Sequence, residues 1–149
     1  MNTPDFILVF PGYFEQEMLF RYILFVRNQK PNVKEFPVQT KSLNTMALAA
    51  IMDCVYRLPE RHELEIKTKS NYIKNLFDKR DYDLCKDETD KKYLFNILYN
   101  ISWKSLKVDV KMLNKETYIS PHGIIVENRN APEWNDSIER DDIKFQFNV

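Results

Sequence analysis

The chain has 149 residues, of which 44% are hydrophobic and 13% are aromatic, and its 22 lysine and arginine residues balance 22 aspartate and glutamate residues. This length is typical of one domain with a sizeable core, and the balanced charge gives no overall attraction to nucleic acid or to an anionic membrane. Two glycines, Gly12 and Gly123, are too few for a glycine-rich phosphate loop or a dinucleotide-binding fingerprint.

The N-terminal part of the chain predicts three strands. Residues 5–10 form an unbroken apolar run, which is typical of a central strand covered on both faces, and Pro11-Gly12 is expected to end it. Leu19–Val26 is rich in aromatic and β-branched residues and predicts a second strand, paired with the first. Residues 33–39 predict a third strand, which Pro37 places at the edge of the sheet.

The middle of the chain predicts a buried helix, a strand and a short helix. Residues 43–58 are apolar on nearly every side of a helix until Pro59 interrupts the run. Residues 63–67 alternate between apolar and charged side chains, as in a half-buried strand. Ser70 is well suited to cap the N-terminus of a helix over residues 71–79.

The last elements are predicted from periodicity alone. Residues 78–87 are polar and predict a surface loop, whereas residues 90–103 carry apolar side chains at helical spacing and predict a second long helix. Residues 106–113 alternate so regularly that they predict the clearest strand of the chain. Short strands are expected at residues 124–126 and 143–147.

Charge is unevenly distributed along the chain. From residue 127 to residue 149 six acidic residues outnumber three basic ones, which leaves residues 1–126 positive by about three. We therefore predict a domain over residues 1–126 and an acidic C-terminal extension over residues 127–149.

Cysteine usage and the N-terminal residues bear on the cellular compartment. Cys54 and Cys85 lack the CxxC spacing of a zinc site. The N-terminus lacks the basic start and apolar core of a signal peptide, and no apolar run is long enough to cross a membrane. We expect an intracellular protein, in the cytoplasm or alternatively in the nucleus, with reduced thiols, no membrane association, no cofactor and no small-molecule substrate.

The order strand, strand, strand, helix, strand, helix, helix, strand over residues 5–113 resembles a ribonuclease H-like domain. In the type 1 ribonuclease H family, the central helix carries an Ala-Glu-Leu-x-Ala motif and the next strand ends in Thr-Asp-Ser-x-Tyr-Val. The similar segments here are Met-Ala-Leu-Ala-Ala at residues 46–50 and Thr-Lys-Ser-Asn-Tyr-Ile at residues 68–73. More loosely, His122-Gly123 and residues 128–132 resemble a later loop of that family. The resemblance implies an α/β fold, in which helices pack on the faces of a mixed five-stranded sheet.

The same resemblance implies that catalysis is absent. The family's reaction uses four clustered carboxylates that hold two magnesium ions about 4 Å apart. The corresponding positions here are Pro11, Ala47, Lys69 and Pro132. None of these side chains binds magnesium, and the ammonium group of Lys69 would oppose the entry of a cation. We therefore expect no enzyme activity, no catalytic residue and no metal site.

Two sets of residues are candidates for binding. The first set suits nucleic acid, because basic side chains can contact a phosphate backbone and an aromatic side chain can stack on bases. The alternative is that these charges are simply solvated. This set comprises Lys67, Lys69, Lys74, Lys79, Arg80, Trp103 and Lys107, with Lys104 beside the last two. Aromatic residues suit a protein interface, although they could equally pack within the fold; this set comprises Tyr13, Phe14, Phe20 and Trp134.

From these observations we expect a noncatalytic ribonuclease H-like module that contacts an unidentified protein partner. Its setting would be a nucleic-acid-handling assembly or, by analogy alone, a viral or mobile-element factor that blocks a host protein. The alternative is a noncatalytic binder of double-stranded RNA or of an RNA/DNA hybrid. A third hypothesis is a magnesium-dependent nuclease with displaced acids at Glu15, Glu17 or Asp53.

Overall fold

The computed structural model describes the backbone of residues 4–14, 19–29, 32–37, 42–113, 117–119 and 125–127, and the side chains of residues 4–10, 20, 22–29, 32–34 and 42–113. Its strands are β1 (Phe6–Phe14), β2 (Leu19–Val26), β3 (Asn32–Pro37), β4 (Glu63–Thr68), β5 (Lys107–Met112), β6 (Thr117–Ile119) and β7 (Ile125–Glu127). Its helices are α1 (Leu43–Arg57), α2 (Asn71–Lys79), the 3₁₀ turn η1 (Tyr82–Leu84) and α3 (Glu88–Trp103).

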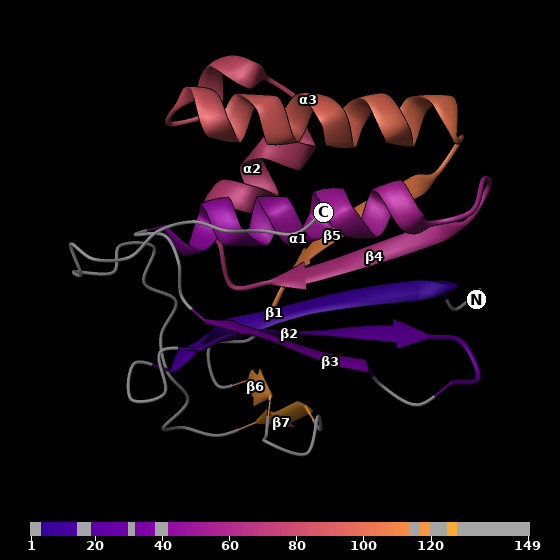
Figure 1. Ribbon diagram of the computed structural model, residues 1–149, viewed down its shortest axis with the longest axis vertical. Helices are drawn as coiled ribbons and strands as arrows, with labels where there is room; N and C mark the ends of the chain where they lie inside the picture. Colours follow the sequence, from indigo (N-terminus) through magenta and orange to yellow (C-terminus); the bar gives the residue numbers. More distant parts are fainter. Residues whose placement is uncertain are drawn as a thin grey trace.

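Five of the strands form one mixed sheet in the order β3-β2-β1-β4-β5. β2 is antiparallel to both of its neighbours, whereas β1, β4 and β5 are mutually parallel. The helices of the described chain lie on one side of this sheet (Figure 1). α1 contacts β1, α2 contacts β4 and β5, and α3 packs on α1. The prediction of an α/β fold with a mixed five-stranded sheet is confirmed, but the described helices cover one face and not both.

β6 and β7 pair with each other and lie on the side of the sheet away from the helices (Figure 1). β6 contacts β1 and β2. β7 lies within one residue of the strand predicted at residues 124–126, and β6 was not predicted separately. Residues 128–149, with the strand predicted at residues 143–147 and most of the predicted acidic extension, lie outside the described residues.

β1 is the central strand of the sheet. Leu8, Val9 and Phe10 are all fully buried. Because successive side chains of a strand point to opposite faces, both faces of β1 are covered, as the apolar run predicted.

The prediction that Pro11-Gly12 ends β1 is wrong, since the strand continues to Phe14. Pairing with β4 stops at Phe10, and the register with β2 shifts between Val9 and Gly12. A proline has no N–H to donate, and it is tolerated in strands at bulges and where one neighbour is missing. The bulge and the end of β4 pairing therefore explain how β1 passes through Pro11.

Side-chain caps begin the three α-helices. Ser42 Oγ accepts from Thr45 N at 3.2 Å at the start of α1, and Ser70 Oγ accepts from Ile73 N at 3.2 Å at the start of α2. The capping role predicted for Ser70 is confirmed. Asp87 caps α3, which consequently begins two residues earlier than predicted. No helix in the described part of the chain has both the length and the apolar character needed to cross a membrane.

Candidate functional site

Two of the positions that resemble metal ligands lie at one edge of the sheet. β1 and β4 run parallel, with Phe10 opposite Thr68 as the last pair, so Pro11 and Lys69 follow at the same edge of the sheet. Ala47 is fully buried on α1. Lys69 is half-buried, and its partial loss of hydration lowers the pKa of its ammonium group. Pro132 lies outside the described residues.

A buried polar network links the N-terminal turns of the three helices near this edge. The centre of this network is Asp90, which is fully buried. Its carboxylate accepts from Thr45 Oγ1 at 2.7 Å and from the Tyr72 hydroxyl at 2.7 Å. Burial raises the pKa of Asp90, and the two hydroxyl donors oppose that rise by stabilising the charged form. Asp90 therefore ties α3 to both α1 and α2.

The segment that most resembles the ribonuclease H motif serves the same junction. Ser70, which caps α2, donates through its hydroxyl to Asn44 Oδ1 at 2.6 Å. Its backbone N–H donates to Thr68 Oγ1 at 3.1 Å. These contacts hold the turn between β4 and α2. In this chain the Thr, Ser and Tyr of the motif therefore have structural partners within the protein.

The importance of Asp90 was missed from the sequence, where it was interpreted as a residue at the start of the helix. A signal was nevertheless present, because Asp90 lies at helical spacing from Leu94, Ile97 and Ile101, the buried side chains of α3. An acidic residue on the buried face of a helix needs hydrogen-bond donors from its neighbours.

Displaced acids do not gather at this edge in the described structure. Asp53 Oδ1 instead pairs with Arg57 Nε at 2.8 Å on α1, and Glu15 and Glu17 lie outside the described residues. Among the described residues, no group of three or more His, Cys, Asp or Glu side chains is arranged to hold a metal ion.

The predicted nucleic-acid-binding residues are spread over the molecule. Lys67 points to the sheet face opposite the helices, because it alternates with Ile66, which is buried beneath them. Lys79 and Arg80 are exposed at the C-terminal end of α2, where Arg80 has a left-handed backbone with φ of 51°. Lys107 lies opposite Glu63 at the start of β4, and Lys69 lies beyond its end.

Most of these lysines have an acidic neighbour. Lys74 Nζ lies 2.9 Å from Asp78 Oδ1. Lys67 Nζ lies 3.9 Å from Glu65 Oε2. The described structure therefore does not bring the predicted basic residues together into one unpaired cationic surface.

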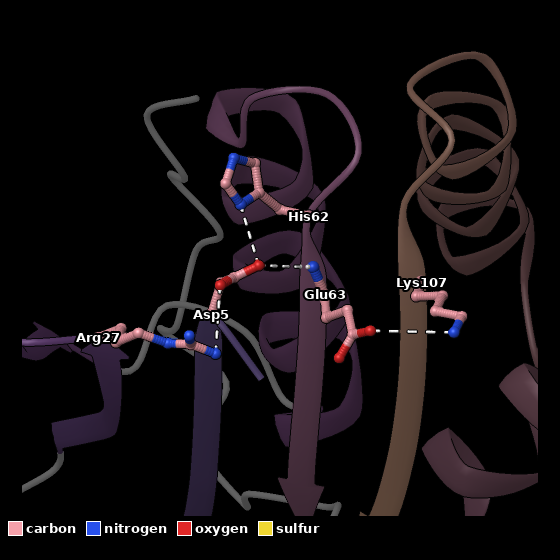
Figure 2. A network of polar contacts seen from close by, with 5 residues as sticks. All are labelled: Asp5, Arg27, His62, Glu63 and Lys107. Carbon is pink, nitrogen blue, oxygen red and sulfur yellow. Dashed lines mark hydrogen bonds and ion pairs between the residues drawn. The ribbon is translucent and has the colours of Figure 1, made fainter. Parts of the chain in front are cut away.

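Figure 2 shows the polar contacts around Lys107, at the end of the sheet where β1 and β4 begin. Lys107 Nζ lies 3.9 Å from Glu63 Oε1, and the Glu63 N–H donates to Asp5 Oδ2 at 3.3 Å. Asp5 also contacts His62 Nδ1 at 3.0 Å and an Arg27 guanidinium nitrogen at 3.4 Å. The His62 hydrogen bond and the Glu63 N–H lower the pKa of Asp5. This network connects the starts of β1 and β4.

Lys104 does not belong to an exposed basic surface, contrary to the expectation from the sequence. It is buried, and its Nζ donates to the carbonyl oxygens of Val55 and Leu58, each at 3.0 Å, and to that of Tyr56. These carbonyls end α1, where helical hydrogen bonds run out. Lys104 is therefore a C-terminal cap for α1.

The outer face of α3 carries a row of exposed aromatic side chains, which we call the aromatic row. Phe95, Tyr99 and Trp103 are 57%, 61% and 54% exposed, and their spacing of four residues places them on one side of the helix. Phe95 and Tyr99 stack with ring centroids 6.4 Å apart. Tyr82 of η1 lies beside Phe95, with centroids 6.2 Å apart.

A hollow adjoins the N-terminal end of the aromatic row. Its volume is about 370 Å³, and it is lined by Tyr82, Lys91, Lys92, Phe95 and Asn96. Of the aromatic row, Trp103 alone was predicted from the sequence to be a binding residue. Phe95 and Tyr99 could have been found by noting that they fall away from the helix face formed by Leu94, Ile97 and Ile101.

Of the four residues predicted to contact a protein partner, Phe20 is the one whose side chain the structure describes. Phe20 is fully buried and packs against Phe10 and Tyr22, with ring centroids 6.0 Å and 6.1 Å away, so the prediction that it contacts a partner is wrong. Its aromatic ring fills the core beneath α1. Tyr13 and Phe14 belong to β1, but their side chains lie outside the described residues, as does Trp134.

Comparison with known sequences gives no match: neither a protein-family model nor a curated protein is similar to this chain.

Proposed function

We propose that the protein is a noncatalytic ribonuclease H-like module that binds a protein partner through the aromatic row of α3. The observation that carries this proposal is the exposure of Phe95, Tyr99 and Trp103 on one side of an outer helix. A contiguous apolar surface of this kind marks an interaction site more often than a solvated face, and large aromatic side chains are typical anchors of protein interfaces.

The strand arrangement supports the ribonuclease H-like part of the proposal. The resemblance requires the first strand to lie beside the strand that follows the central helix. β1 and β4 are parallel neighbours, paired from Phe6 and Leu64 to Phe10 and Thr68. The elements up to β5 also follow one another in the order that suggested the family, with η1 as an insertion.

The chemistry of the resembled ligand positions supports a role without catalysis. Ala47 offers no oxygen to a metal ion, and the Lys69 ammonium repels one. The nearby carboxylate of Asp90 is already hydrogen-bonded by Thr45 and Tyr72 and is fully buried. A protein that keeps this fold without those ligands can still function through its surface.

Protein binding is favoured over RNA binding because three of the six basic residues predicted to contact phosphate lie beside acids. Glu65, Asp78 and Glu63 lie within ion-pair distance of Lys67, Lys74 and Lys107 respectively. In the part of the chain that the structure describes, Phe95, Tyr99 and Trp103 each keep more than half of their surface exposed. An interface built on the aromatic row would depend weakly on salt, in contrast to a phosphate-led complex.

The test is site-specific photo-crosslinking in cells that express the protein. The photoreactive residue p-benzoylphenylalanine replaces Phe95 in one variant and Met112, an exposed apolar residue on β5, in the control. We expect a discrete protein adduct from position 95 that is absent from position 112. The adduct identifies the partner, whose affinity for the purified protein is then measured directly.

The purified partner makes the test quantitative. Replacing Phe95 and Tyr99 with serine should weaken binding by 100-fold or more, about the effect of losing two anchor residues, whereas Met112→Ser should leave it unchanged. Equal crosslinking at both positions, or unchanged affinity of the double variant, would overturn the proposal. So would magnesium-dependent cleavage of an RNA/DNA hybrid, or salt-sensitive binding of double-stranded RNA by the purified protein.

A further inference from the structure

A second hollow lies on the helix side of the sheet, between α1 and strands β1 to β3. Its volume is about 410 Å³, within the usual range of small-molecule sites. Leu8, Tyr22 and Leu24 form part of its apolar lining, and Leu58 lies at the end of α1. This pocket is separate from the aromatic row, whose residues do not line it.

The sheet register explains why the pocket exists. Leu8 lies opposite Leu24, and Leu24 lies opposite Asn32, so one row of side chains crosses β1, β2 and β3. Tyr22 lies opposite Lys34 in the next row of the same face. A helix about 10 Å wide covers roughly two strands spaced by about 4.8 Å. Because α1 packs against β1, the same face of β2 and β3 extends beyond the helix.

The charges at the pocket are unequal. Asp53 pairs with Arg57 at 2.8 Å, so this carboxylate and this guanidinium balance each other. Lys34 also lines the pocket, and in the described part of the chain no carboxylate pairs with it. An apolar lining beside an unbalanced ammonium group fits a molecule with an apolar body and an anionic end.

We propose that this pocket binds a medium-chain aliphatic carboxylate, with its chain against Leu8, Tyr22 and Leu24 and its carboxylate beside Lys34. The buried Tyr22 stays a neutral phenol, since burial and the nearby Asp53 both raise its pKa. Tyr22 therefore adds no negative charge that would repel the ligand.

The experiment is a titration of the ¹⁵N-labelled full chain, followed by two-dimensional NMR, with octanoate, octylamine and octan-1-ol as probes. We expect octanoate to shift the amide signals of β2, β3 and the second half of α1, and to bind at least tenfold more tightly than octylamine. The affinity for octan-1-ol should lie between the affinities for octanoate and octylamine. Equal affinities for the carboxylate and the amine would overturn the proposal, as would the absence of shifts at these amides.

Two variants locate the site. Lys34→Gln should weaken octanoate binding about fivefold or more and leave octan-1-ol binding unchanged, whereas Lys92→Gln, on α3, should alter neither. Leu24→Trp fills the pocket and should abolish binding of all three probes. If Leu24→Trp fails to fold, the Lys34→Gln comparison still decides the matter, because an unchanged octanoate affinity contradicts the assigned carboxylate position.

Discussion

Lys104 Nζ lies 3.0 Å from the carbonyl oxygen of Val55, a residue 49 positions earlier in the chain. It also donates to the carbonyls of Tyr56 and Leu58, so one ammonium group serves three acceptors at the end of α1. A positive charge at a helix C-terminus also interacts favourably with the helix dipole. The residue that follows α3 thus completes α1, the helix on which α3 packs.

Lys104→Met should lower the free energy of unfolding by about 2–4 kcal/mol, because buried carbonyls lose a charged donor while the packing of the alkyl chain is retained. Urea denaturation at neutral pH measures the difference. Lys92→Met, at an exposed position on α3, is the control and should change stability by less than about 0.5 kcal/mol. Similar effects of the two substitutions would show that the cap does not stabilise the fold.

Asp90 provides a second prediction, since it accepts from Thr45 and Tyr72 within the junction of three helices. Asp90→Ala should destabilise the protein by about 2–3 kcal/mol, because both hydroxyl groups lose their acceptor in a buried setting. Tyr72→Phe should cost about 1 kcal/mol.

A double-mutant cycle between Asp90→Ala and Tyr72→Phe measures their coupling by urea denaturation. The combined variant should be less destabilised than the sum of the single variants, because Tyr72→Phe removes a group that Asp90→Ala would leave unsatisfied. Strictly additive effects would contradict the described contact.

The regular elements could be predicted because each has a local signal in the sequence. The alternation that predicted β4, and Ser70 before α2, depend on neighbours within a few residues. The apolar run at residues 5–10 likewise indicated a strand buried on both faces. Periodicity and helix capping depend on residues that are close in the sequence, so these elements were predicted correctly.

The errors concern residues whose role depends on distant parts of the chain. Pro11 is accommodated in β1 by a bulge opposite β2, and Phe20 is buried by Phe10 and the helix above it. Lys104 looks like an ordinary surface lysine until α1 is placed beside α3. The aromatic row was within reach of sequence reasoning, because its spacing of four residues is visible, but its exposure depends on which face of α3 contacts α1.

Asp5 gives a prediction on acid stability. Contacts with His62 and Glu63 lower its pKa in the folded state below the value of about 3.9 expected when unfolded. Because the pKa is lower in the folded state, the contribution of Asp5 to the free energy of unfolding is fully present above the unfolded-state pKa. It is lost as the pH falls through the folded-state pKa.

The stability difference between the native sequence and Asp5→Asn should therefore shrink as the pH falls from 5 to 3. Urea midpoints measured for both proteins at pH 7, 5, 4 and 3 provide the comparison. A difference that widens between pH 5 and pH 3 would have the wrong sign and would contradict the assigned interactions of Asp5.

Cys54 gives the last prediction, on chemical reactivity. It is buried on α1, and burial raises the pKa of its thiol to about 12, with a smaller contribution from Asp53. Only the thiolate is alkylated, so at pH 8 a fraction of about 10⁻⁴ of the Cys54 thiol is reactive.

In a Cys85→Ser variant, where Cys54 is the remaining thiol, alkylation by iodoacetamide should be at least 100-fold slower than in the urea-unfolded chain. Mass spectrometry follows the alkylation, whose rate should rise about tenfold per pH unit between pH 7 and pH 10 without a plateau. A plateau near pH 9 would indicate an ordinary exposed thiol and would contradict the burial of Cys54 against the sheet.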